Sequence, residues 1–174
     1  MSDFLLRAQN YCAKAERCRQ DVVRRLWVWK VPQEERGQII TSLENDGFID
    51  ENRYANAFVH DKVELSGWGM RKIKNTLISK GISNDTIENA MSRYEQHDDT
   101  DKLVKQLDSK AGQLLRTARF ARVCAIDPDG DDYEARKVLY DFRNRLLRFA
   151  VARGFDVSVA SQVIEQLLND LRTK

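Results

Sequence analysis

Two short stretches contain residue types that bind metals, but neither has the pattern that a metal site needs. His60 and Glu64 lie four residues apart, as on one helical face, yet no HExxH pattern and no third ligand accompany them, which favours a surface pair. The run DPDGDD at 127–132 begins like a calcium loop. Its Gly stands at the fourth position and Val138 at the twelfth, which favours a solvated turn. The sequence therefore predicts no metal site.

Two further stretches suggest catalytic chemistry and also fall short of it. Cys124 lies among arginines, whose charge would favour a reactive thiolate, but no His with an Asp or Asn partner is evident. The stretch GWGMRK, which starts at Gly67, lacks the GxxxxGK[ST] pattern of a phosphate-binding loop, and no strand precedes it. We therefore expect no catalytic residue, no cofactor and no enzymatic activity.

Composition predicts an all-α protein. The chain has 174 residues, of which 42% are hydrophobic and 32% charged, with eight Gly and two Pro among many strong helix formers. The three cysteines follow no metal-binding spacing, and no apolar run approaches the roughly 18 residues that a membrane span needs. The N-terminal stretch also lacks the apolar core of a signal peptide. We expect a reduced, cytoplasmic protein without a membrane segment.

Helix stop and start signals divide the chain into nine expected helices. Pro32 must stop one helix and start the next, because its ring cannot follow a helical residue and it lacks an N–H. Glycines end other helices, and a cap residue follows some of them. The seventh helix is expected from about residue 103, with a possible extension to about Cys124. The helix ends are expected at Gly47, Gly67, Gly81 and Gly154, and the caps at Asp50, Ser83 and Asp156.

One ten-residue pattern recurs three times. Residues 73–82 (IKNTLISKGI) and 146–155 (LLRFAVARGF) share apolar residues at the first and fifth places and end in a basic residue, Gly and a large apolar residue. Residues 22–31 (VVRRLWVWKV) match them, except that Trp29 stands at the basic place and Lys30 where the others have Gly. Such units cannot bury their apolar faces alone, so they stack into an elongated, curved array. The expected three-helix repeats are 1–47, 48–97 and 98–174, the last with an inserted or extended first helix.

The small net charge of +2 hides basic segments. Residues 65–84, 109–126 and 142–155 each hold four basic residues and no acid, so a folded chain can present basic faces. Ordinary solvated helix faces paired with acids of neighbouring helices remain an equal alternative. Three tryptophans add a possible stacking surface for bases. We expect Trp68 to pack at a helix junction, and Trp29, which stands at a place that is basic in the other copies, to be the better candidate for an exposed contact.

Four segments resemble a known family. YCAKAERCRQDVVRRL, LENDGFIDENRYANAFV, GWGMRKIKNTLISKGIS and LLRFAVARGF, in this order, resemble the signature segments of RecX, the bacterial regulator of the RecA recombinase. The resemblance covers residues 8–95 closely and 136–168 more loosely. The family usually has Ser where Cys18 stands and Gly where Lys30 stands, and residues 98–132 depart in length. Cys is a poor helix cap, so the turn that begins at Cys18 should be less stable by about 1 kcal/mol than with Ser. Lys30 must either adopt a positive φ or end its helix through Pro32.

The resemblance implies a negative modulator of RecA. Members of the family bind in the groove of the RecA–DNA filament and inhibit its recombinase, ATPase and coprotease activities, which bear on recombination, DNA repair and the SOS response. By resemblance this chain would do so as a monomer, with RecA and possibly DNA within the filament as its partners. We expect the contact residues to be Arg24, Arg25, Arg71, Lys72, Lys74, Arg145, Arg148 and Arg153.

Two other functions fit the same residues. A direct DNA-binding protein would use the three-helix units like helix-turn-helix modules, each with a basic helix in a groove of DNA, and its affinity would fall steeply with salt. A helical-repeat scaffold for some other protein would need neither RecA nor DNA.

Overall fold

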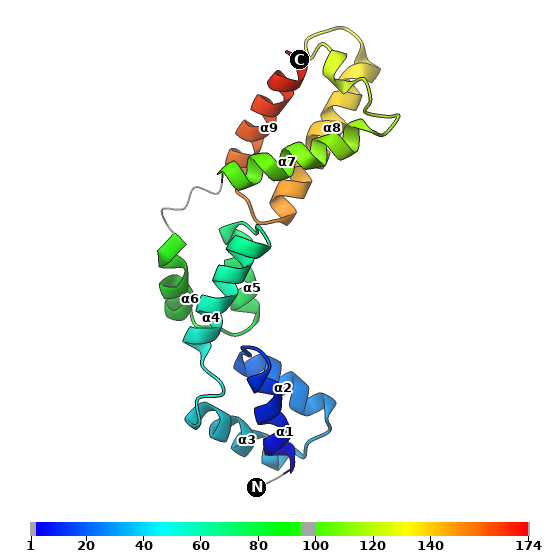
Figure 1. The fold of residues 1–174 in the computed structure, drawn as a ribbon. Coiled ribbons are helices and arrows are strands. Elements are labelled where there is room, and N and C mark those ends of the chain that lie inside the picture. The colour runs from blue at the N-terminus through cyan, green and yellow to red at the C-terminus, as the bar shows by residue number, and fades with distance from the viewer. Residues whose placement is uncertain (1–2, 95–99, 174) are drawn as a thin grey trace. The chain divides into compact units, whose positions relative to one another are not determined.

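The structure is a computed structural model that describes residues 3–94 and 100–173. Within these residues the backbone forms nine α-helices and no strand, which confirms the all-α class (Figure 1). The helices are α1 (Asp3–Ala13), α2 (Arg19–Val28), α3 (Gln33–Asn45), α4 (Glu51–His60), α5 (Met70–Ser79), α6 (Asn84–Met91), α7 (Thr100–Leu115), α8 (Tyr133–Ala152) and α9 (Val157–Arg172).

The described chain packs as two compact units. The N-terminal unit comprises residues up to 66 together with 73–94, and the C-terminal unit comprises residues 67–72 together with 100–173. In the first, α1, α2 and α3 close around Leu26 and Leu43, and α4 packs on α6. In the second, α7, α8 and α9 pack on one another around Leu107, Phe142 and Ile164. Helices α1–α3 and α7–α9 thus each form a group of three. The exact repeat boundaries stay a prediction, and the last one, at 97/98, lies outside the described residues.

Helices α2, α5 and α8 end in the same turn, at the positions that the repeat aligns. At the end of α2 the amide of Lys30 donates to the carbonyl of Trp27 (3.0 Å), and the amide of Val31 donates to that of Leu26 (3.1 Å). This pair of bonds is a Schellman motif, in which the penultimate residue takes a positive φ. The same pair of bonds closes α5 from Gly81 and Ile82 and closes α8 from Gly154 and Phe155.

Lys30 takes the positive φ of this turn, at +57°, where Gly81 and Gly154 stand in the other repeats. A side chain in this region costs roughly 1–2 kcal/mol. We therefore expect Lys30→Gly to raise the free energy of unfolding by about 0.5–1 kcal/mol, and Gly81→Ala, at φ +78° and with open space around its Cβ, to lower it by a similar amount. Urea unfolding of the two variants checks this. A change of the same sign in the free energy of unfolding of both variants would contradict the prediction.

The expected extension of α7 to about Cys124 is wrong, since α7 ends at Leu115. Its inner stripe ends at Leu114, and a continued helix would next turn Ala118 and Ala121 toward the core. Ending the helix instead lets Phe120 fold back into the core, 1% exposed and with its ring edge-on to Phe142 at 5.4 Å. The need to bury a large aromatic therefore outweighs helix propensity here.

Most expected caps form, and one is missing as predicted. The side chains of Asp50, Ser83 and Asp156 accept from backbone amides at the starts of α4, α6 and α9. At the start of α2, Cys18 makes no side-chain cap bond. At 127–132, the carboxylate of Asp127 accepts from the amide of Asp129 (3.0 Å), as in a turn.

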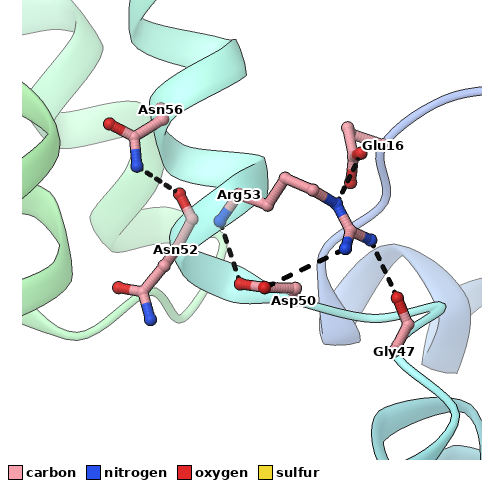
Figure 2. A network of polar contacts seen from close by, with 6 residues as sticks. All are labelled: Glu16, Gly47, Asp50, Asn52, Arg53 and Asn56. Carbon is pink, nitrogen blue, oxygen red and sulfur yellow. Dashed lines mark hydrogen bonds and ion pairs between the residues drawn. The ribbon is translucent and has the colours of Figure 1, made fainter.

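Polar contacts join the first three helices to the next three within the N-terminal unit. Arg53, in the first turn of α4, donates to Glu16 (2.7 Å) and to the carbonyl of Gly47 (3.0 Å) (Figure 2). The Lys80 ammonium, at the end of α5, donates to both carboxylate oxygens of Asp21 on α2 (2.8 and 3.0 Å). The Asp21–Lys80 pair is part-buried, whereas the Arg53 pair is more exposed.

The partial burial of the Asp21–Lys80 pair predicts a pH-dependent contribution to stability. Burial alone would raise the pKa of Asp21, but bonds from Lys80 and Cys18 and the charges of Lys80 and Arg17 lower it overall. Burial would lower the pKa of Lys80, but bonds to Asp21 and Tyr54 raise it overall. A lowered carboxyl pKa contributes stability that is lost as pH falls through it, and a raised ammonium pKa contributes stability that is lost as pH rises through it.

We expect Asp21→Asn to lower the free energy of unfolding at neutral pH by about 1–2 kcal/mol. The difference from the parent protein should shrink as pH falls below about 4, where the unfolded state takes up a proton at Asp21, and should vanish at lower pH, once the folded state takes up the proton too. Glu16→Gln, which neutralises an exposed pair, is the matched control and should cost less than about 1 kcal/mol. Urea unfolding across pH checks both. A cost for Asp21→Asn that persists unchanged in acid would contradict the role of the charge.

Candidate partner-binding surface

The predicted basic residues of α2 lie on an exposed face. Arg24 and Arg25 are both exposed, and the Arg25 guanidinium lies 4.8 Å from the centre of the Tyr11 ring. The prediction that Trp29 is the better candidate for an exposed contact is wrong, because Trp27 is 61% exposed and Trp29 is half-buried. Trp29, the residue after the end of α2, lies edge-on to Tyr11 of α1 at 5.9 Å.

Helix α5 begins with three predicted contact residues in different surroundings. Arg71 is exposed and makes no ion pair in the part of the chain that the structure describes. The Lys72 ammonium lies 4.0 Å from the centre of the half-buried Trp68 ring. Lys74 reaches Glu88 at 3.9 Å. Of the three, Arg71 is the cation most available to a partner.

The segment before α5 packs on the end of α8 within the C-terminal unit. The amide of Gly69 donates to the carbonyl of Arg153 (2.8 Å), and Gly69 is buried. The glycine is required here, because a Cβ would lie 2.5 Å from the carbonyl carbon and oxygen of Gly154. The glycines of GWG are therefore structural, and they place Arg71 beside Asp156, whose pKa is lowered first by bonds from Ser158 and last by this arginine.

The three predicted residues of α8 also differ in their contacts. Arg148 is exposed and has no ion pair among the described residues. Arg145 lies 5.2 Å from the centre of the Phe120 ring, and Arg153 lies 4.5 Å from that of Phe149. Among the other arginines of this unit, Arg119 and Arg143 pair with acids.

The structure also brings Arg153 together with two basic residues that were not among the predicted contact residues. Lys105 and Lys110 of α7 line one groove with Arg153, and Phe149 of α8 forms part of its wall. We call this space, of about 310 Å³, the α7–α8 groove. Lys105 lies between Asp101 and Asp108 in the sequence and was not singled out, although both acids lie off the groove. Lys110 belongs to the acid-free stretch 109–126 but was not among the predicted contact residues.

The residues considered for catalysis and metal binding form no such site in the described chain. Across residues 3–94 and 100–173 no three His, Cys, Asp or Glu side chains gather as metal ligands. The ring of His60 contacts the Tyr94 hydroxyl at 3.1 Å. Cys12 and Cys18 are free and buried, and burial raises the pKa of both thiols, which disfavours the reactive thiolate.

Comparison with known proteins places this fold. Residues 50–91, which begin at the cap of α4 and include all of α5 and α6, match a family described as RecX, second three-helix domain. Curated relatives along most of the chain carry the same family name. The chain is thus similar to RecX proteins along most of its length. Within the described residues, no helix has the length and apolar character needed to cross a membrane.

Relatives in the family are distant in sequence but similar in fold. Regulatory protein RecX of Clostridium botulinum is 27% identical over 130 residues, which cover 75% of this chain and 52% of that one. Regulatory protein RecX of Finegoldia magna is 26% identical over 154 residues, covering 88% and 66%. The chain thus spans about half the length of its Clostridium relatives. The crystal structure of RecX from Lactobacillus salivarius superposes with a TM-score of 0.63, at 21% identity over 94% of this chain and 93% of that one.

Proposed function

We propose that this protein is a negative modulator of the RecA recombinase. It binds in the groove of the RecA–DNA filament, as a cytoplasmic monomer and without catalysis, and inhibits the recombinase, ATPase and coprotease activities of RecA. The match of residues 50–91 to the second three-helix domain of RecX carries the proposal, since this is the segment that contains the basic start of α5. The relatives themselves bear the name regulatory protein.

The charges of the candidate surface support a protein or phosphate partner. Arg24, Arg71 and Arg148 are exposed and form no ion pair among the residues that the structure describes, although the charge of Arg71 acts on nearby Asp156. Such cations are suited to acidic protein surfaces and to phosphates, because neither ion pairing nor burial has to be reversed before they bind. Helical repeats provide a series of similar surfaces for a partner that itself repeats, as a filament does.

A titration of RecA activity tests the proposal. The DNA-dependent ATPase of the RecA from the same organism is measured with this protein added from substoichiometric to equimolar amounts. We expect progressive inhibition. Binding to DNA alone is titrated with salt beside it: tight, salt-sensitive binding without any inhibition would favour the direct DNA-binding alternative. Absence of both effects would contradict the proposal and favour a scaffold for another protein.

A further inference from the structure

The α7–α8 groove collects positive charge without any acid. Lys105 and Lys110 contribute from α7 and Arg153 from the end of α8, and no lining residue is acidic. None of the three makes an ion pair within residues 3–94 and 100–173. Elsewhere in the unit, Arg143 lies 2.6 Å from Glu165, so acids of this unit do pair with arginines of α8. The groove therefore holds three cations whose mutual repulsion only a bound anion or solvent can offset.

Two of these cations are held in place by an aromatic ring. The Arg153 guanidinium lies 4.5 Å and the Lys110 ammonium 5.7 Å from the centre of the Phe149 ring. Phe149 is half-buried and packs against the core of the C-terminal unit, so the ring is a fixed support. Cations that rest on an aromatic ring lose less side-chain freedom when a ligand binds. The two cations are therefore preorganised for binding an anion.

The size of the groove favours a compact anion with several charges. Side chains on one face of an extended peptide are about 7 Å apart, so a space of about 310 Å³ would admit roughly one carboxylate of an acidic peptide. A chain of phosphates instead brings several charges into the same space. Lys binds phosphate as a point charge and Arg binds it through two parallel bonds. The Ser109 hydroxyl and the Gln113 amide are further donors in the lining.

We propose that the α7–α8 groove binds a short chain of phosphates, such as the triphosphate of a nucleotide or inorganic tripolyphosphate. Lys105, Lys110 and Arg153 hold the phosphate oxygens, and Phe149 supports the latter two cations. The site would give the protein a small-molecule ligand of its own, apart from any filament. The proposal does not depend on RecA.

Calorimetric titration of the full chain tests the ligand class. We expect tripolyphosphate and ATP to bind at one site, and orthophosphate and AMP to bind at least about tenfold more weakly. Equal affinities for tripolyphosphate and ATP would show that the groove recognises only the phosphate chain. Clearly tighter binding of ATP would show that it also recognises the nucleoside. No binding of either would overturn the proposal. So would equally tight binding of hexaglutamate or of a short oligodeoxythymidylate, since these would identify a carboxylate or a nucleic-acid strand as the ligand.

Matched variants locate the site. Lys110→Gln and Arg153→Gln should each weaken tripolyphosphate binding at least about fivefold, and the double variant more than either. Lys137→Gln makes the same charge change at an exposed position of α8 outside the groove and should change the affinity less than about twofold. Circular dichroism checks that each variant is folded. If Lys137→Gln weakened tripolyphosphate binding as much as the groove variants do, the groove would not be the binding site, because the affinity would then depend only on net charge. The assay contains no RecA, so its failure would leave the proposed regulation of RecA standing.

Discussion

Gly154→Ala is expected to lower the free energy of unfolding of the C-terminal unit by about 3 kcal/mol. Gly154 has a φ of +90°, which a side chain rarely adopts, and its new Cβ would lie 2.5 Å from the backbone nitrogen of Lys72. Neither obstacle can be relieved by turning a flexible side chain, because the contact is with backbone. The segment that begins α5 would have to move away from the end of α8, and the bond from Gly69 to Arg153 (2.8 Å) would be lost.

Gly112→Ala is the matched control for this prediction. Gly112 lies within α7, and a Cβ there would meet nothing within 4 Å, so the change should raise stability by about 0.5–1 kcal/mol through helix propensity alone. Urea unfolding followed by circular dichroism measures both. If Gly154→Ala costs no more than about 0.5 kcal/mol, the close approach of residues 67–72 to the end of α8 is contradicted.

Reversing the charge of Arg71, Lys72 and Lys74 to Glu is expected to weaken binding to RecA filaments by about 10- to 100-fold, with the helical circular dichroism unchanged. The effect should come mainly from Arg71, which is exposed and forms no ion pair in the described chain. Lys74 already lies near Glu88, and Lys72 lies over Trp68, so these two have less free charge to offer. Arg71→Glu alone should therefore reproduce most of the loss.

A control variant with the same change in net charge distinguishes an effect of the start of α5 from an effect of the total charge. Lys14, Arg136 and Lys137 are exposed, and reversing these three should change filament binding less than about threefold. Inhibition of the RecA ATPase, titrated with each variant, provides the readout. Equal losses in the two triple variants would show that only net charge counts. Loss of helical signal in the first would make the start of α5 structural instead.

Local backbone signals made most of the fold predictable. Pro32 and the glycines at 47, 81 and 154 end helices wherever they occur, because their backbone preferences act within one turn. The alignment of Lys30 with two of those glycines indicated that this lysine could take a positive φ, and it does. The end of α7 was not predictable in this way. It depends on where Phe120 can be buried, and that depends on packing against Phe142 of a later helix.

The candidate surface was predictable only where its basic residues lie in acid-free stretches of the sequence. Arg71 and Arg148 lie in acid-free stretches and were predicted as contact residues, whereas Lys105 lies between Asp101 and Asp108 and was missed. Lys110 lies in the acid-free stretch 109–126 but was not predicted as a contact residue. A helical signal was present, since Lys105, Ser109 and Gln113 recur every four residues as one acid-free stripe of α7. The sequence does not show that Phe149 and Arg153 form the other side of the groove, because only folding places them beside that stripe.

Co-sedimentation with RecA filaments tests the central proposal most directly. Filaments are assembled on single-stranded DNA, and this protein is added at increasing amounts to the filaments and, separately, to the same DNA without RecA. The account predicts that the protein sediments with the filaments, saturates at a fixed ratio to RecA, and binds the bare DNA at least about tenfold more weakly at physiological salt. Equal binding to bare DNA, or none to the filaments, would contradict it.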